Sequence, residues 1–215
     1  GVWAGYTYQW NREQTEAIRV MNGSPADLGD QTWVFPSEAQ CMQCHTQAAG
    51  FVLGLETAQL NGNYTYPQTG RTANQIVTLR SIDILSPPIG ENPPAYVDPL
   101  DAAQNLVARA RSYLHTNCAN CHRPGGPTGV NMDLRYDTPL AQTGTCNVQP
   151  LRGDLGIAEA RIIAPGDPAR SVLLTRMNRR NDPSMMPPLA SNVVDTAGVR
   201  LIREWINLLT VADCR

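Results

Sequence analysis

Residues 118–122 read Cys-Ala-Asn-Cys-His, and residues 41–45 repeat the same spacing as Cys-Met-Gln-Cys-His. Each stretch places two thiols three positions apart and a histidine directly after the second thiol. The chain contains 3 histidines, and two of them, His45 and His122, occupy this position. Chance placement is a poor explanation. We therefore interpret the two stretches as copies of one motif, and the fold prediction below is built on them.

The Cys-x-x-Cys-His spacing is typical of covalent haem attachment. The two thiols form thioether bonds with the vinyl groups of haem, and the histidine binds the iron as an axial ligand. The sequence therefore predicts two haem c cofactors, one in each half of the chain. The attachment residues are Cys41, Cys44 and His45 for the first haem, and Cys118, Cys121 and His122 for the second.

Three other uses of the four motif cysteines remain open. A single zinc site with four cysteine ligands would explain the thiols but would not require the two histidines. A thioredoxin-like redox pair needs a strand–helix–strand context, which the sequence does not show. Simple disulfides are the third alternative.

Two further cysteines, Cys146 and Cys214, lie outside the motifs. Haem c is attached in an oxidising compartment, where leftover thiols tend to pair. We therefore predict a Cys146–Cys214 disulfide, with two free thiols as the alternative. The same reasoning predicts a periplasmic or extracellular protein, exported by a signal that the sequence no longer carries.

The composition is that of a globular protein with one large or two small domains. The chain has 215 residues, of which 42% are hydrophobic, and its formal net charge is −2. All 17 basic residues are arginine and they form no basic stripe, so we expect no nucleic-acid partner. No apolar run approaches the roughly 18 residues that indicate a membrane span, so we expect none.

We expect a mainly α fold with two small cytochrome c-like haem-binding halves, long loops and little β structure. Residues 86–94 contain four prolines and a glycine, which is incompatible with regular structure. We place the domain boundary in this segment. The first haem-binding domain is then 1–92, and the second is 93–215.

The hydrophobic pattern predicts individual elements. A strand is expected over 2–10, where Tyr6, Tyr8 and Trp10 alternate, and loops or irregular chain over 22–36 and 47–71. A capping box that begins at Ser37 predicts a short helix carrying the first motif. Further helices are expected at about 72–84, 100–116 and 169–178, and from the N-cap residue Asp195 onward, with Val199, Ile202, Trp205, Ile206 and Leu209 facing inward.

Several motifs also resemble known families. Residues 106–209 are similar to the cytochrome c domains abundant in planctomycetes, through segments 117–122, 132–137, 163–171 and 186–189 and the closing Trp205-Ile206. The whole chain resembles a group of diheme c-type proteins whose first half carries patterns like residues 36–45 and 53–61. The resemblance implies a cytochrome fold, haem cofactors and redox activity rather than a particular physiological role.

The resemblance also implies a second iron ligand for the second haem. In the similar domains, a methionine in a proline-flanked loop binds the iron opposite the histidine, and Met186 stands directly before Pro187 and Pro188. Proline stiffens such a loop, so the soft thioether is held against iron at little entropic cost. The neighbouring Met185 and a purely structural role for Met186 are the alternatives.

The first haem has no obvious second ligand, because no methionine lies between His45 and Cys118. The remaining histidine, His115, lies three residues before Cys118, about 4.5 Å along a helix axis. We predict that His115 binds the first iron. The alternatives are an exposed or capping role for His115, ligation by Met21 or Met132, and an open sixth position.

Two function classes follow from these ligands. We favour an electron-transfer protein, either a soluble carrier or part of a larger or polymeric conduit, whose partners are redox proteins or copies of itself. Methionine ligation raises the haem potential relative to two histidines, so electrons are expected to rest on the second haem. The alternative is a diheme redox enzyme of peroxidase type with an open iron position on the first haem.

Overall fold

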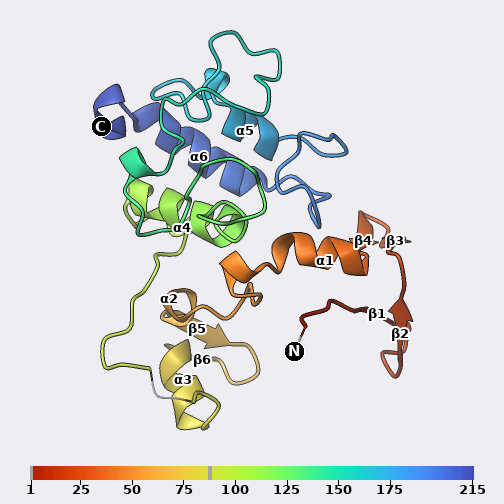
Figure 1. Ribbon diagram of the computed structural model, residues 1–215. Coiled ribbons are helices and arrows are strands. Elements are labelled where there is room, and N and C mark those ends of the chain that lie inside the picture. The colour runs from red at the N-terminus through yellow and green to blue at the C-terminus, as the bar shows by residue number, and fades with distance from the viewer. Residues whose placement is uncertain (1, 87–88) are drawn as a thin grey trace.

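The computed structural model describes residues 2–86 and 89–215 and divides into two contrasting halves (Figure 1). The first half contains six short strands that pair into three separate antiparallel two-stranded sheets. The strands are β1 (Thr7–Trp10), β2 (Ala17–Val20), β3 (Ser24–Asp27), β4 (Thr32–Phe35), β5 (Asn63–Tyr66) and β6 (Arg71–Asn74). The helices are α1 (Glu38–Cys44), α2 (Thr57–Leu60), α3 (Gln75–Ser81), α4 (Leu106–Cys118), α5 (Val172–Met177) and α6 (Thr196–Leu208).

The expected mainly α fold with little β structure is wrong. Helix accounts for 30% of the chain and strand for 13%, and every strand lies before residue 75. Residues 22–36, which we expected to be loop, form the β3–β4 hairpin. Gly29 adopts a φ of +88° at its tip, and its N–H donates to the Asp27 side chain over 2.8 Å. Gly29 and Asp27, residue types that favour turns, therefore close a hairpin.

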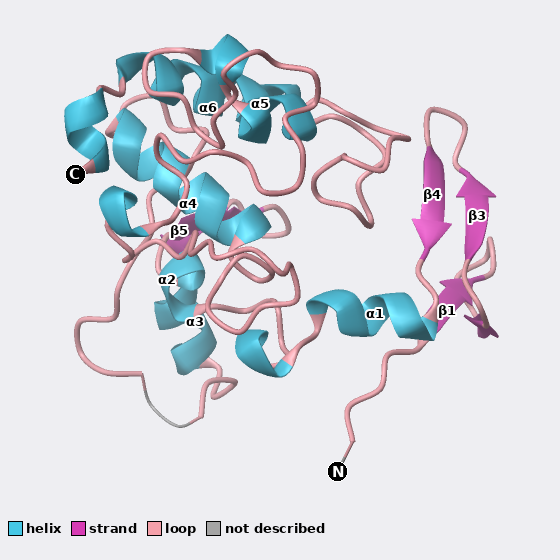
Figure 2. Cartoon of the chain, turned by 45° about the horizontal axis from the view of Figure 1, so that its top comes forward, coloured by secondary structure: helices cyan, strands magenta, loops and turns pink. Residues whose placement is uncertain are grey.

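The first half buries very few apolar side chains. Within residues 2–86, only Ala58 and Ile76 are buried hydrophobic residues. The aromatic residues of the N-terminal strands stay exposed, and Trp10 retains 61% of its accessible surface. Figures 1 and 2 show β1–β4 extending beyond α1, away from the helices of the second half. Hydrogen bonds between paired strands, rather than a shared hydrophobic core, therefore hold β1–β4 together.

The second half has a hydrophobic core between α4, α5 and α6. Its buried members are Ala110, Leu114, Ile163, Leu174, Met177, Val199, Ile202, Trp205, Ile206 and Leu209. The prediction for α6 is confirmed, because Asp195 caps the helix by accepting from the Gly198 N–H and all five inward residues are buried. Gly198 has no side chain, and a Cβ there would lie 2.2 Å from the Tyr113 ring of α4. This glycine permits the close approach of α6 to α4.

Helix α4 is shorter than the hydrophobic spacing predicted. It begins at Leu106 because the Asn105 side chain accepts hydrogen bonds from the N–H groups of Val107 and Ala108. This capping fixes Asn105 outside the helix. Leu100, which the predicted helix over 100–116 included, lies outside α4 and is 68% exposed. The helix nevertheless runs through to Cys118 and delivers the second motif as expected.

The Cys146–Cys214 disulfide is confirmed, with a Cα–Cα separation of 5.3 Å. It joins the C-terminal 3₁₀ turn (Val211–Cys214) to a loop whose backbone bridges Ile163 in the core. The chain end is thereby fastened to the second half. Of the helices in the described part of the chain, none combines the length and apolar character that a transmembrane span needs.

The boundary segment 86–94 includes residues 87 and 88, which lie outside the described residues. On either side of them, 82–86 and 89–105 contain no helix or strand. The division into domains 1–92 and 93–215 stays a prediction.

Candidate haem attachment sites

The second motif follows directly from the end of α4. The His122 N–H donates to the Cys118 carbonyl over 2.9 Å, and the Cys121 N–H donates to the same oxygen over 3.1 Å. This turn brings Cys118, Cys121 and His122 to one wall of a cavity. The chain then passes close behind the motif, where a Cβ on Gly126 would lie 2.0 Å from the Cys121 carbonyl oxygen. Only glycine fits at that position.

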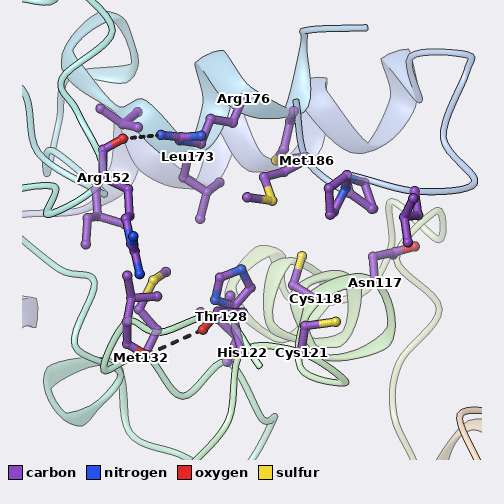
Figure 3. Close-up of a pocket in the computed structure, with 18 of the residues that line it drawn as sticks. Asn117, Cys118, Cys121, His122, Thr128, Met132, Arg152, Leu173, Arg176 and Met186 are labelled. Carbon is purple, nitrogen blue, oxygen red and sulfur yellow. Dashed lines mark hydrogen bonds between the residues drawn. The ribbon is translucent and has the colours of Figure 1, made fainter. Parts of the chain in front are cut away.

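The cavity has a volume of about 440 Å³. Most of its lining is apolar, with side chains that include Leu134, Ile162, Val172, Leu173, Met177 and Val199. Figure 3 shows Met186 on the wall opposite His122, with Cys118 and Cys121 beside them. The Met186 N–H donates to the Arg176 carbonyl over 3.1 Å, which ties its loop to the end of α5. Cavities of this size and character suit a largely apolar cofactor.

The side chains in the cavity fit covalently attached haem. The Nδ1 atom of His122 is buried and has no hydrogen-bond partner among the described residues. Burial, and secondarily the charge of Arg176, lower the pKa of His122, so its imidazole is neutral and able to bind a metal ion. Burial also raises the pKa of the Cys118 thiol to about 12. The site thus offers two thiols, a neutral imidazole and a thioether around an apolar space.

The structure distinguishes between the methionines. Met186 lines the cavity and Met185 does not. Met177 also lines the cavity but belongs to the hydrophobic core at 8% exposure. Met132, an alternative ligand for the first iron, lines the cavity of the second motif, on the side that also holds His122 (Figure 3). Of these methionines, Met186 is the one that lines the cavity on the wall opposite His122.

Three arginines, Arg152, Arg176 and Arg180, line the mostly apolar cavity together with the acid Asp195. The Arg176 guanidinium donates to the carbonyls of Ser184 and Arg152, over 3.0 and 2.7 Å. These contacts hold the loop that carries Met186 against the segment that carries Arg152. Guanidinium groups are suited to pairing with carboxylates such as the propionates of a haem.

The first motif is presented by α1. The capping box is confirmed, because the Ser37 side chain accepts from the Gln40 N–H and the Gln40 side chain accepts from the Ser37 N–H. Cys41 and Cys44 lie on this helix, and His45 ends it. The Nδ1 atom of His45 lies 2.6 Å from the Phe51 carbonyl oxygen. A carbonyl only accepts, so Nδ1 carries the proton and Nε2 is the nitrogen left to bind iron.

The N-terminal arm lies against the first motif. Trp3 stacks on Phe51 with ring centroids 5.2 Å apart. A Cβ on Gly5 would lie 2.7 Å from the Cys41 sulfur, so glycine is required for this approach. The arm therefore covers part of α1 at the first thiol, next to the carbonyl that orients His45.

His115 is placed in a contact between the two halves. Its Nε2 donates to the Glu56 carboxylate over 2.8 Å, and its Nδ1 accepts from the Tyr136 N–H over 2.9 Å. The side chain is 8% exposed and packs against Tyr96, whose hydroxyl donates to Glu56. Neither ring nitrogen is free to bind iron while these bonds hold. Ligation of the first iron by His115 stays a prediction, and the alternative ligand Met21 is 65% exposed.

The two motifs meet through their second cysteines. The Cys121 thiol donates to the Cys44 sulfur over 3.8 Å. This contact lowers the pKa of Cys44 and raises that of Cys121. Across 2–86 and 89–215, no group of three or more His, Cys, Asp and Glu side chains is arranged to hold one metal ion. The four motif thiols are therefore not gathered in the manner of a four-cysteine zinc site.

Sequence reasoning missed the groups that support these motifs. The Phe51 carbonyl that orients His45 carries no sequence signal, because every residue has a carbonyl. Glu56 is a lone acid in an irregular segment and lies 59 positions from its partner His115. Arg176 could have been suspected only from its place on the helix that precedes the methionine loop.

Comparison with protein-family models, curated proteins and solved structures gave no match to this chain.

Proposed function

We propose that this chain is a diheme c-type electron-transfer protein that works outside the cytoplasm. The first haem is held by Cys41, Cys44 and His45, and the second by Cys118, Cys121 and His122. The observation that carries the proposal is the cavity in which His122 faces Met186 across an apolar space beside both thiols of its motif. Bound haem supplies an iron that changes between the ferric and ferrous states by one electron.

The residues of the second site have separable tasks. Cys118 and Cys121 would attach the haem covalently, and His122 and Met186 would supply the ligands of its iron. The apolar lining excludes water, and a histidine–methionine pair gives a higher reduction potential than two imidazoles. Arg152, Arg176 and Arg180 line the same cavity and would offset the negative charge of the propionates. Together these groups favour electron storage over substrate binding.

The location outside the cytoplasm is supported by the Cys146–Cys214 disulfide, because such bonds persist in oxidising compartments. Haem c attachment requires the same kind of compartment. We propose that the partners are redox proteins or further copies of this chain, and that the protein acts as a carrier or within a larger conduit.

A pyridine haemochrome count on protein produced in a periplasm that attaches haem c tests the proposal. We expect two haems per chain that survive acid extraction. The variants Cys41→Ser/Cys44→Ser and Cys118→Ser/Cys121→Ser should each retain one. Cys146→Ala/Cys214→Ala is the control that removes equally many cysteines, here the disulfide pair, and it should retain two. A chain whose haem is extracted by acid, or that takes up none, would refute the proposal.

A second function, a diheme redox enzyme of peroxidase type, is favoured by one observation. Both nitrogens of His115 are already hydrogen-bonded, so the first iron has no assigned second ligand. An open position would accept carbon monoxide in the reduced protein. Binding at one of the two haems, together with peroxide turnover, would support the enzyme. If neither haem binds carbon monoxide, the enzyme is excluded and electron transfer is the remaining function.

A further inference from the structure

We infer that the two haem sites are in direct contact at Cys44 and Cys121, so that electrons pass between them inside one chain. This inference rests on the proposed function, because it concerns thiols that attach haem. Beyond that function, the two sites form one redox unit. They meet at Cys44 and Cys121, which lie 77 residues apart in the sequence.

The contact has an internal symmetry. Cys44 and Cys121 are the second cysteines of their respective motifs, and their sulfur atoms lie 3.8 Å apart. Gln43 and Cys44 also line the cavity of the second site, next to Cys118 and Cys121. The first motif therefore contributes to the wall of the second site. The same position of each motif, its second cysteine, forms the contact.

A network outside the thiols maintains this contact. The Arg123 side chain donates from Nη1 to the Ala48 carbonyl over 3.3 Å, and from Nε to the Ala119 carbonyl. Ala48 lies just after the first motif, and Ala119 lies within the second. A Cβ on Gly125 would be 3.7 Å from the Ala48 Cβ, so the two loops pack closely. Arg123 thus acts as a positioning residue that fastens one motif to the other.

The chemistry follows from how the thiols are used. Each sulfur becomes a thioether bonded to the carbon next to the macrocycle, so two bonds separate each sulfur from a ring edge. Sulfurs in contact therefore bring the two ring edges close together. With haem held by both motifs, one electron would pass from a ferrous to a ferric iron, so that the first iron is oxidised as the second is reduced. No atom or proton moves, and no other reactant is required.

Soret circular dichroism of the haem-loaded protein tests the contact, because closely placed haems give a bisignate band. We expect such a band in the wild type. It should be lost in Cys41→Ser/Cys44→Ser and in Cys118→Ser/Cys121→Ser, each of which keeps one haem. A wild-type protein with two haems whose spectrum equals the sum of these two variants would overturn the inference and leave the proposed function standing. A wild type without two covalent haems would refute the proposed function itself.

A measurement on the wild type alone guards against variants that fail to fold. The paramagnetic resonance spectrum of the ferric site is recorded in half-reduced and in fully oxidised protein. Sites in contact should broaden each other in the oxidised sample, and identical line widths in both states would overturn the inference. The role of Arg123 is tested by Soret circular dichroism. Arg123→Met should weaken the bisignate band, whereas Arg200→Met, at an exposed position on α6, should not. An unchanged band in Arg123→Met would refute the positioning role of Arg123.

Discussion

Removal of the Cys146–Cys214 disulfide should destabilise the chain by a predictable amount. The two cysteines are 68 residues apart, and closing a loop of that length in the unfolded chain corresponds to about 4 kcal/mol in the chain-entropy model. For a chain of this size, each kcal/mol corresponds to a shift of about 2–4 °C in Tm. Cys146→Ala/Cys214→Ala should therefore lose about 4 kcal/mol of unfolding free energy and melt roughly 8–16 °C lower.

Urea unfolding of the haem-loaded protein, followed by far-ultraviolet circular dichroism, measures this loss. The single variants Cys146→Ala and Cys214→Ala are the matched controls, because each already lacks the cross-link. The double variant should therefore be about as destabilised as either single variant, rather than by the sum of both. The Soret spectrum should not change, because neither cysteine lines the cavity. A loss under about 1 kcal/mol, or additive single effects, would refute the loop-entropy reasoning.

Three further predictions concern the motifs. Met186→Ala should abolish the ferric thioether-to-iron charge-transfer band and let cyanide bind the second haem; a band that persists would exclude Met186 as the ligand. Glu56→Gln should cost about 1–2 kcal/mol in urea unfolding, because His115 loses a charged acceptor at a partly exposed site, and unchanged stability would contradict that contact. In haem-free protein, iodoacetamide should label Cys44 at lower pH than Cys118. The contact with Cys121 lowers the pKa of Cys44, burial raises that of Cys118 to about 12, and only the thiolate reacts. Mass spectrometry of the labelled peptides measures both rates, and equal pH profiles would contradict the placement of these thiols.

The sequence was most informative where the signal is local. The capping box at Ser37 depends on residues three positions apart, and the structure contains it as expected. The amphipathic spacing of α6 likewise indicated its buried face, because one helix face must enter a core. The disulfide was predictable by elimination, since only two cysteines remained after the motifs were assigned.

The sequence was least informative in the first half. Turn residues in 22–36 indicated a loop, although the same residues close the β3–β4 hairpin. The start of α4 was predicted six residues too early, because helical apolar spacing continues before Asn105, where the chain forms no helix. Hairpins and capping choices depend on which backbone groups find partners, and composition alone does not specify those partners.

The sequence by itself determined which groups each motif offers, because two thiols and a following histidine lie within one short local segment; that they hold a haem is our proposal. It could not determine what stands opposite or beside each motif. The placement of Met186 across from His122, the engagement of His115 by Glu56 and the meeting of Cys44 with Cys121 all join residues far apart in the chain. Such contacts are decided only when the helices pack, since packing rather than spacing brings distant side chains within reach of one another.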